Sequence, residues 1–192
     1  MTTIIFDYDW SLINCNSDTY IFEKLLETNI QNISPMTHVK KGLSWTHAVN
    51  AALVELHDIT HCTSLDILNC IGNVPMQDGM IHALQYAKMK ECQIYILSDA
   101  NTIFIKAMLV QYNLESFVNG IVTNGACFLQ DGLLQITPFH DENKEKHGCK
   151  HCPLNLCKGS VVTKWMEEKE IERIVYIGDG RGDFCPALKL KR

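Results

Sequence analysis

Two aspartates spaced i, i+2, Asp7 and Asp9, stand at the end of an apolar run near the start of the chain. The run is typical of a buried parallel strand, which need not alternate polar and apolar positions. Side chains at i and i+2 of an extended chain lie on the same side, so the two carboxylates can converge on one small volume. Carboxylates that close repel each other unless a cation or a shared proton relieves them. The pair suits a divalent metal with a carboxylate nucleophile, and the alternative is two solvated aspartates in a loop.

Two later segments repeat this pattern of an apolar run followed by polar residues. One run leads into Ser98 and Asp99, ahead of a helical pattern whose free N–H groups would favour an anion. The other leads into a glycine-rich turn that carries Asp179 and Asp183. Open α/β folds bind ligands at the carboxyl ends of their strands, so we expect these side chains at one edge of a sheet. Lys158 precedes another helical run, where a lysine is either part of this site or an ordinary surface charge.

Together these residues resemble the four signature motifs of the haloacid dehalogenase (HAD) superfamily of phosphatases. The D-x-D-x-[T/S/V] motif corresponds to residues 7–11, and the second-motif serine corresponds to Ser98. The third-motif lysine corresponds to Lys158, and the acidic G-D-G-x-x-D motif corresponds to residues 178–183. Because order and spacing both fit, the match is much more specific than any one motif.

Three longer stretches, 98–102, 147–158 and 178–186, point to one group within this superfamily. They are similar to the phosphoethanolamine/phosphocholine phosphatase and pyridoxal-phosphate phosphatase group, which also includes plant thiamine-monophosphate phosphatase-like proteins. These relatives continue for about another strand and helix beyond the position of Arg192, where this chain ends. We therefore expect a core that is truncated at its C-terminus.

The resemblance implies a Mg²⁺-dependent phosphatase that works through an aspartyl-phosphate intermediate. Asp7 would attack phosphorus, and Asp9 would protonate the leaving alcohol and then deprotonate the hydrolytic water. Ser98 and Lys158 would bind the transferring phosphoryl group and stabilise its charge. The residues implied for the metal site are Asp7, Asp9 through its backbone carbonyl, Asp179, and Asp183, which binds through water or orients Lys158.

The resemblance also implies a binding site for the amine end of the substrate. In phosphocholine-type relatives, acidic side chains near the first two motifs face the amine, and by position they match Asp18 and Asp99. A carboxylate beside an ammonium is electrostatically favourable. The alternative is that Asp18, Ser98 and Asp99 cap helices. Pyridoxal phosphate and thiamine monophosphate, the rival substrates, would need an aromatic partner for their rings. The candidates for stacking are Trp10, Tyr20 and Trp45.

The chain has nine cysteines, and three of them, Cys149, Cys152 and Cys157, have metal-ligand spacing. They would form a structural zinc site with a histidine or Cys185 as the fourth ligand. A redox-active pair is one alternative. A reduced loop that positions Lys158 by packing is the other.

Positioning these residues requires an α/β fold, and the resemblance implies a Rossmann-like, doubly wound parallel sheet as the HAD core. Alternation of strand and helix patterns from residue 93 onward predicts a parallel sheet. Residues 128–137 predict a β-hairpin. The region between the first strand and residue 75 is helical in pattern, so we expect a small helical cap at 14–74. The core would then comprise 1–13 and 75–192.

The composition agrees with a folded enzyme, because 46% apolar and 20% charged residues exclude disorder. A net charge of −5 without a basic stripe argues against a nucleic-acid partner. The chain has no apolar run of the roughly 20 residues that span a bilayer, and its N-terminus lacks signal-peptide features. We therefore expect a cytoplasmic enzyme that acts on a small-molecule phosphate ester. The alternatives are an inactive or truncated binding or regulatory protein on the same fold and a phosphotransferase or mutase of the superfamily.

Overall fold

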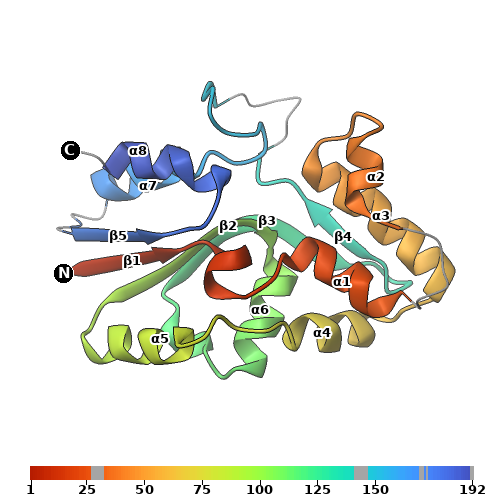
Figure 1. Cartoon of the computed structure of the whole chain (residues 1–192), viewed down its shortest axis with the longest axis horizontal. Coiled ribbons are helices and arrows are strands. Elements are labelled where there is room, and N and C mark those ends of the chain that lie inside the picture. Colours follow the sequence, from red (N-terminus) through yellow and green to blue (C-terminus); the bar gives the residue numbers. More distant parts are fainter. Residues whose placement is uncertain (27–32, 141–146, 169–170, 172, 191–192) are drawn as a thin grey trace.

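A five-stranded sheet in the order β4-β3-β2-β1-β5 forms the centre of the computed structural model (Figure 1). The four parallel strands are β1 (Thr2–Phe6), β2 (Gln93–Asn101), β3 (Gly120–Phe128) and β5 (Arg173–Ile177). The fifth strand, β4 (Leu134–Thr137), is antiparallel to β3. The structure describes residues 1–26, 33–140, 147–168, 171 and 173–190. The prediction for the end of the chain at Arg192 lies outside these described residues.

Neighbouring residues of the central strands enter two hydrophobic clusters, one on each face of the sheet. Phe6 and Ile96, which are paired in register, belong to the larger cluster, whereas Ile5 and Leu97 belong to the smaller one. Burial on both faces explains why these strands read as continuous apolar runs. Helices on the larger cluster's face are α5 (Met80–Met89) and α6 (Thr102–Gln111), and those on the other face are α7 (Lys158–Glu168) and α8 (Phe184–Leu190) (Figure 1). The predicted doubly wound α/β fold is confirmed.

Four helices gather at the end of the sheet where β4 lies (Figure 1). They are α1 (Ser17–Leu25), α2 (Pro35–Val39), α3 (Trp45–Thr60) and α4 (Ser64–Gly72). The apolar faces of α1, α3 and α4 join the larger cluster, in which Leu53 and Ile67 share one core with Phe104 of α6. The Asn50 side chain donates to the Ile136 carbonyl at 2.6 Å and accepts from the Ile136 N–H at 2.8 Å. Helix α3 thereby satisfies backbone groups of the edge strand β4, which would otherwise be open to pairing.

The predicted hairpin is present, but its first strand is much longer than expected. The turn between β3 and β4 closes with a hydrogen bond from the Leu129 N–H to the Leu133 carbonyl at 2.8 Å. Gly132 has φ +91° in this turn, a conformation that favours glycine. The three remaining short turns of helix are η1 (Tyr8–Leu12), η2 (Glu115–Phe117) and η3 (Arg181–Asp183).

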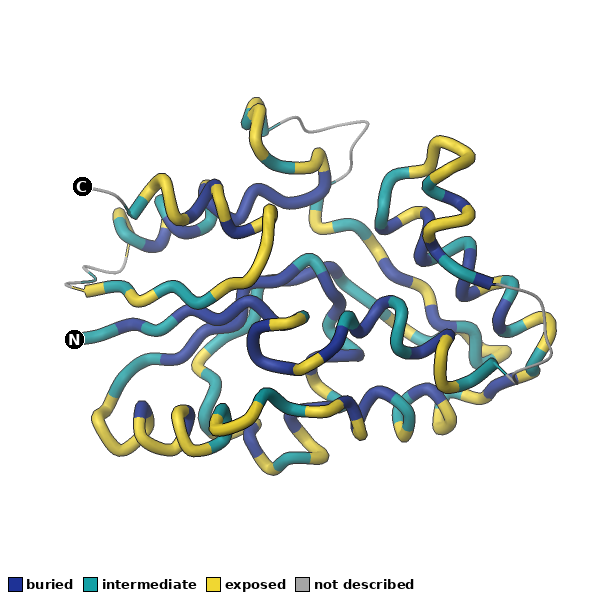
Figure 2. Tube along the Cα trace, in the orientation of Figure 1, coloured by how far each residue is buried: buried dark blue, intermediate teal, exposed yellow. Residues whose placement is uncertain are grey.

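Within the sheet, buried residues concentrate along β1 and β2, and they continue into η1, the turn that follows β1 (Figure 2). Within η1, Tyr8, Ser11 and Leu12 are buried. The first polar residues after β1 are thus held in the interior rather than in a mobile surface loop. Among the described helices, none combines the length and the apolarity that crossing a membrane would need.

Candidate active site

Three carboxylates, those of Asp7, Asp179 and Asp183, lie close together after the ends of β1 and β5. Asp7 follows β1 directly, and its N–H donates to the carbonyl of Ile177, the last residue of β5, at 2.8 Å. Asp179 and Asp183 follow β5 in the glycine-rich turn and η3. Oxygen atoms of Asp7, Asp179 and Asp183 all lie within 4.8 Å of one another. This convergence was expected, because the carboxyl ends of parallel strands share one edge of the sheet.

Lys158, the first residue of α7, lies between two of these carboxylates. Its Nζ is 2.6 Å from Asp7 Oδ2 and 3.0 Å from Asp183 Oδ1. The lysine side chain is only 4% exposed, so the alternative of an ordinary surface charge is wrong. Burial lowers the pKa of Lys158, but the neighbouring carboxylates of Asp7, Asp99 and Asp183 outweigh it, so the net pKa is raised. The ammonium therefore stays charged.

Asp183 accepts hydrogen bonds from three donors, and the sequence did not indicate one of them, Tyr176. The Tyr176 hydroxyl donates to Asp183 Oδ1 at 2.6 Å, and the Gly180 N–H donates to Oδ2 at 3.0 Å, in addition to the bond from Lys158. Gly178 makes room for this carboxyl, because a Cβ there would lie 2.3 Å from Asp183 Cγ. The signal for Tyr176 was weak: it is a single tyrosine that follows Ile174 and Val175 in β5.

Asp7 is buried, and its two oxygens have different partners. Oδ1 accepts from the Tyr8 N–H at 2.7 Å, and Oδ2 faces Lys158. Burial raises the pKa of Asp7 to about 6; the ammonium of Lys158 lowers it, while the charge of Asp183 raises it. A further cation beside these carboxylates would lower this pKa and keep Asp7 anionic at neutral pH.

The carboxylate of Asp9 lies outside this cluster, which corrects the expected convergence of Asp7 and Asp9. Strand β1 ends at Phe6, so Asp9 belongs to the turn η1 and not to the strand. Its Oδ1 accepts from the N–H of Ser17, at the start of α1, at 2.7 Å. Burial, with the nearby charge of Asp18, raises the pKa of Asp9 well above its ordinary value. A carboxyl whose pKa is raised holds its proton more tightly than an ordinary aspartate does, which suits it to act as a general acid.

Ser98 is fully buried near the carboxyl end of β2. Its Oγ accepts a hydrogen bond from the Ala100 N–H at 3.2 Å. Helix α6 is capped by Asn101, whose Oδ1 accepts from the N–H groups of Ile103 and Phe104 at 3.1 and 3.0 Å. The interpretation of Ser98 and Asp99 as helix caps is therefore wrong.

Asp18 is also buried, but no cation of the described residues lies beside it. Its Oδ2 accepts from Trp45 Nε1 at 2.7 Å, and the cap of α1 is Asn16 rather than Asp18. Asp18 and Asp99 line the same small gap, and within the described part of the chain neither forms an ion pair. Burial raises the pKa of Asp18 to about 7; the Trp45 hydrogen bond lowers it, and the charge of Asp99 raises it.

Asp99 and Trp45 also border a cavity of ≈ 90 Å³ on the neighbouring side. Two asparagines that the sequence did not indicate, Asn124 and Asn155, form hydrogen bonds around this cavity. Asn124 donates to the Asp99 carbonyl at 2.6 Å, and Asn155 donates to Asn124 Oδ1 at 2.9 Å and to Thr46 Oγ1 at 3.2 Å. These contacts join residues far apart in the sequence, and no local pattern indicates them.

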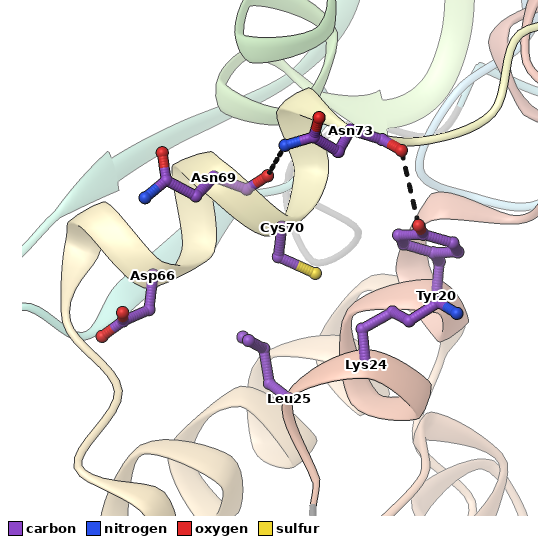
Figure 3. Close-up of a pocket in the computed structure, with 7 residues that line it drawn as sticks. All are labelled: Tyr20, Lys24, Leu25, Asp66, Asn69, Cys70 and Asn73. Carbon is purple, nitrogen blue, oxygen red and sulfur yellow. Dashed lines mark hydrogen bonds between the residues drawn. The ribbon is translucent and has the colours of Figure 1, made fainter.

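A larger cavity, of ≈ 360 Å³, lies between α1 and α4 (Figure 3). Tyr20 lines it, and the Tyr20 hydroxyl donates to the Asn73 carbonyl at 3.4 Å. Its lining includes none of the predicted catalytic residues. Trp10 is 51% exposed, with φ +55° in the turn after Asp9. Of the three aromatic candidates for stacking, only Trp45 lies against the gap that holds Asp18 and Asp99.

The carboxylate cluster fits a hard divalent cation such as Mg²⁺, which prefers oxygen ligands. Asp179 is exposed and accepts one hydrogen bond, from the Ser11 hydroxyl at 3.3 Å, so its oxygens remain available. Both oxygens of Asp183 already accept hydrogen bonds from protein donors. Of the two aspartates that follow β5, Asp179 is therefore the better direct ligand, and Asp183 is the better partner for Lys158.

Solved structures with the same fold define the class of protein. A HAD family hydrolase from Salmonella enterica serovar Typhi superposes with a TM-score of 0.68 at 17% identity, covering 98% of this chain and 59% of that one. A phosphoserine phosphatase solved as a phospho-aspartyl intermediate analogue gives 0.65 at 17% identity, covering 97% and 82%. The fold is that of the HAD hydrolases.

Sequence comparisons place the chain in one family among the proteins that share this fold. A family model described as "Putative Phosphatase" matches residues 2–192, so the chain belongs to this family of phosphoric monoester hydrolases. Inorganic pyrophosphatase 2 of Arabidopsis thaliana is 32% identical, and a thiamine phosphate phosphatase-like protein of the same plant is 33% identical. Pyridoxal phosphate phosphatase PHOSPHO2 of Mus musculus is 31% identical. Each alignment covers 98% of this chain but 67%, 76% and 78% of the respective relative.

Proposed function

We propose that this chain is a Mg²⁺-dependent phosphomonoester hydrolase that forms an aspartyl-phosphate on Asp7. The observation that carries the proposal is the buried Asp7–Lys158–Asp183 arrangement at the carboxyl edge of the sheet, with Nζ–O distances of 2.6 and 3.0 Å. A nucleophilic carboxylate must approach an anionic phosphate, and fixed positive charge at that point lowers the barrier. The alternative of an inactive binding protein is disfavoured because these residues are all in place.

The chain's own residues supply most of the chemistry. Asp7 attacks phosphorus, while Lys158 and Ser98 hold the phosphoryl oxygens and stabilise their developing charge. Asp9, whose pKa is raised, gives its proton to the leaving alcohol and then takes one from the attacking water. Bound Mg²⁺ would neutralise charge between the nucleophile and the phosphate. The residues proposed to hold it are Asp7, Asp179, the backbone carbonyl of Asp9, and Asp183.

Residues 14–74 are proposed to act as a helical cap on a core of 1–13 and 75–192. This segment contributes Asp18 from α1 and Trp45 from α3, and the core contributes Asp99. A division of this kind separates the chemistry, which belongs to the core, from substrate choice, which belongs to the boundary with the cap. The nine free cysteines support a reducing compartment, so we also propose a cytoplasmic location.

The proposed substrate is a small phosphate ester that carries a positive charge. Asp18, which has no protein cation beside it among the described residues, and Asp99 line the gap near Trp45, and an ammonium group would bring a positive charge to this pair. Phosphocholine and phosphoethanolamine fit this requirement, and so does thiamine monophosphate with its cationic ring. Pyridoxal phosphate would rely on stacking against Trp45. Inorganic pyrophosphate is disfavoured, because its second phosphate would meet the carboxylates.

The test is phosphate release by the purified chain, with and without Mg²⁺. The panel comprises these four esters and inorganic pyrophosphate, with Asp7→Asn as the matched control. Mg²⁺-dependent release that disappears in the control supports the phosphatase, and the ranking of substrates tests the charge argument. A preference for pyrophosphate would refute the assignment of Asp18 and Asp99. A folded chain that releases phosphate from none of them would refute the proposed activity.

A further inference from the structure

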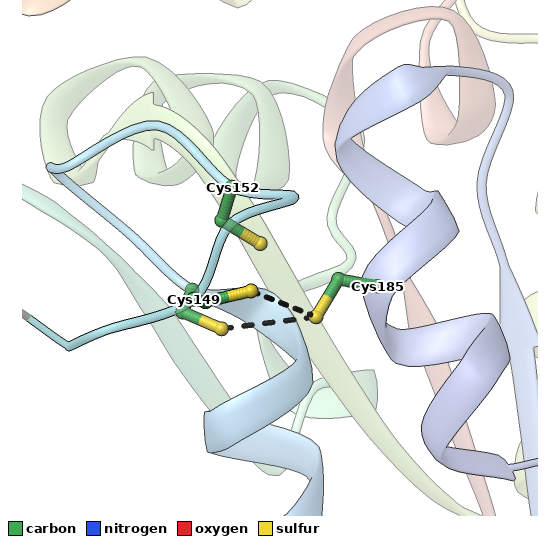
Figure 4. Close-up of side chains that lie close together, drawn as sticks. Cys149, Cys152 and Cys185 are labelled. Carbon is green, nitrogen blue, oxygen red and sulfur yellow. Dashed lines mark hydrogen bonds between the residues drawn. The ribbon is translucent and has the colours of Figure 1, made fainter.

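Four cysteines converge on the side of the sheet that carries α7 and α8 (Figure 4). Cys149 and Cys152 come from the loop before α7, Cys157 directly precedes that helix, and Cys185 lies in α8. Their Sγ atoms all lie within 4.8 Å of one another. The Sγ of Cys185 is 3.7 Å from that of Cys149 and 3.8 Å from that of Cys157. This cluster is separate from the three carboxylates.

We propose that these four thiolates bind one structural zinc ion. A tetrahedral site with Zn–S bonds of about 2.3 Å has S–S edges of roughly 3.8 Å, and the Sγ–Sγ distances from Cys185 to Cys149 and to Cys157 match that edge. A disulfide would need sulfur atoms about 2.05 Å apart. All four cysteines are free in the structure. The geometry therefore favours a shared metal over a redox pair.

The fourth ligand is Cys185 and not a histidine. His147 uses both ring nitrogens within the loop: Nε2 is 2.8 Å from the Pro153 carbonyl, and Nδ1 accepts from the Cys149 N–H at 3.1 Å. The ring of His151 packs edge-on against Phe184, with ring centroids 5.5 Å apart. Both histidines thus support the shape of the cysteine loop. The sequence left this choice open, because Cys185 is distant in the chain.

The surroundings of the sulfur atoms suit thiolate ligands. The Ser160 N–H donates to the Sγ of Cys157 at 3.4 Å, so the N-terminus of α7 faces that sulfur with its positive end. Gly159 permits the close approach of Cys185, because a Cβ there would lie 2.4 Å from the Cys185 Sγ. Cys157 and Cys185 are buried, whereas Cys149 and Cys152 are partly exposed. The exposed pair gives a metal ion an entry path.

The zinc would fix the two segments that carry the Lys158–Asp183 pair. Cys157 immediately precedes Lys158, and Cys185 lies two residues after Asp183. Binding both cysteines to one ion ties the start of α7 to the start of α8. Lys158 Nζ and Asp183 Oδ1, which are 3.0 Å apart, would then be held by two segments that the zinc ion cross-links. The metal acts as a positioning element and takes no part in the reaction itself.

The first experiment measures metal in the full chain purified under reducing conditions without chelator. We expect about one zinc ion per chain, and cobalt exchanged into the site should give the thiolate charge-transfer and strong visible bands of a tetrahedral cobalt–sulfur centre. Cys185→Ser should lose the metal and these bands. Cys127→Ser, which alters an exposed cysteine of β3 outside the cluster, should keep both.

The second readout is thermal stability, because a structural metal contributes to folding. A strong chelator should lower the Tm of the wild-type chain and of Cys127→Ser, and added zinc should restore it. If Cys185→Ser does not fold, Cys149→Ser at the exposed side of the cluster replaces it. A folded wild-type chain that binds neither zinc nor cobalt, or that shows a disulfide among these cysteines by mass spectrometry, would overturn the proposal. None of these readouts depends on phosphatase activity.

Discussion

Asp7 and Asp18 are both buried carboxylates, but among the described residues only Asp7 has a cation beside it. Lys158 Nζ lies 2.6 Å from Asp7 Oδ2, whereas Asp18 Oδ2 accepts a hydrogen bond from the indole N–H of Trp45. Burial raises the pKa of both, to about 6 for Asp7 and to about 7 for Asp18. Lys158 thus balances the charge of Asp7, whereas no cation of the described residues balances the charge of Asp18.

This difference assigns different tasks to the two regions. A buried carboxylate without a cation is unfavourable, so a site that keeps one is suited to a ligand that brings the missing charge. The Asp7 region would then carry out the reaction, and the Asp18 region would select the substrate. Variants that act on one region and spare the other test this division.

Removal of the nucleophile has the largest expected effect. Asp7→Asn should lower turnover by roughly four orders of magnitude or more, because the amide cannot attack phosphorus. The amide oxygen can still accept from Lys158, and the buried charge disappears, so the fold should persist. Phosphate release and a thermal melt measure the two effects. Full activity in a folded Asp7→Asn chain would eliminate the proposed mechanism.

Removal of the cation should damage both activity and stability. Lys158→Met leaves Asp7 and Asp183 facing each other without a counter-charge, and breaking a buried ion pair costs about 3–5 kcal/mol. Activity should fall by about 10²–10³-fold as transition-state stabilisation is lost. Lys164→Met is the matched control, because Lys164 lies on the same helix but is 70% exposed. Equal effects of the two variants on the Tm would contradict the buried pair.

Asp18→Asn should affect substrate choice more than turnover. The amide oxygen keeps the Trp45 hydrogen bond but loses the charge, so the KM for phosphocholine should rise by about tenfold, equivalent to about 1.4 kcal/mol. The KM for an uncharged aryl phosphate should stay nearly the same. Steady-state kinetics on both esters measure the difference. Equal losses on the two esters would indicate that Asp18 supports the fold and does not bind the amine.

The same variant gives a pH-dependent stability signal. The Asp18 carboxyl ionises at about pH 3.9 in the unfolded chain, but its pKa is raised to about 7 in the fold. The unfolded state therefore loses its proton first, and wild-type stability falls as pH rises from about 4 to about 7. Asp18→Asn lacks this loss, so its Tm should match wild type at pH 4 and exceed it at pH 8. An unchanged difference across this range would contradict the buried, unpaired carboxylate.

Tyr176→Phe should lower turnover less than removal of either Asp7 or Lys158. It removes the hydroxyl that donates to Asp183 at 2.6 Å, and loss of a hydrogen bond to a charged group costs about 1.5–3 kcal/mol. Turnover should fall by about tenfold as the Asp183–Lys158 pair loses its support, with little change in KM. Tyr86→Phe on the exposed surface of α5 is the control. An unaltered turnover number in Tyr176→Phe would show that Asp183 needs no such support.

The sheet, and the positions of the proposed catalytic residues at its strand ends, were predictable because their signals are local. Apolar runs followed directly by aspartate or serine specify where parallel strands end, and strand ends share an edge. Asp7, Ser98 and Asp179 were found in this way. The same reasoning failed for the Asp9 carboxylate, because the pattern could not show that β1 ends at Phe6 and that a turn begins there.

Contacts between distant segments were not predictable. Nothing near Asp18 in the sequence indicates that Trp45 binds it, and nothing near Asp99 indicates the chain of asparagines through Asn124. Cys185 joins the cysteine cluster only because α7 and α8 pack side by side. Such contacts depend on the register between elements, and a single sequence carries no local signal for that register.

The most direct test of the central claim is detection of the phosphorylated intermediate. The chain is mixed with Mg²⁺ and its best substrate, quenched in acid during turnover, digested with pepsin, and analysed by mass spectrometry. We expect peptides that span Asp7 to gain one phosphoryl group at that residue, and we expect no such label in Asp7→Asn. Phosphate release without a label on Asp7, or with a label on another residue, would contradict the account.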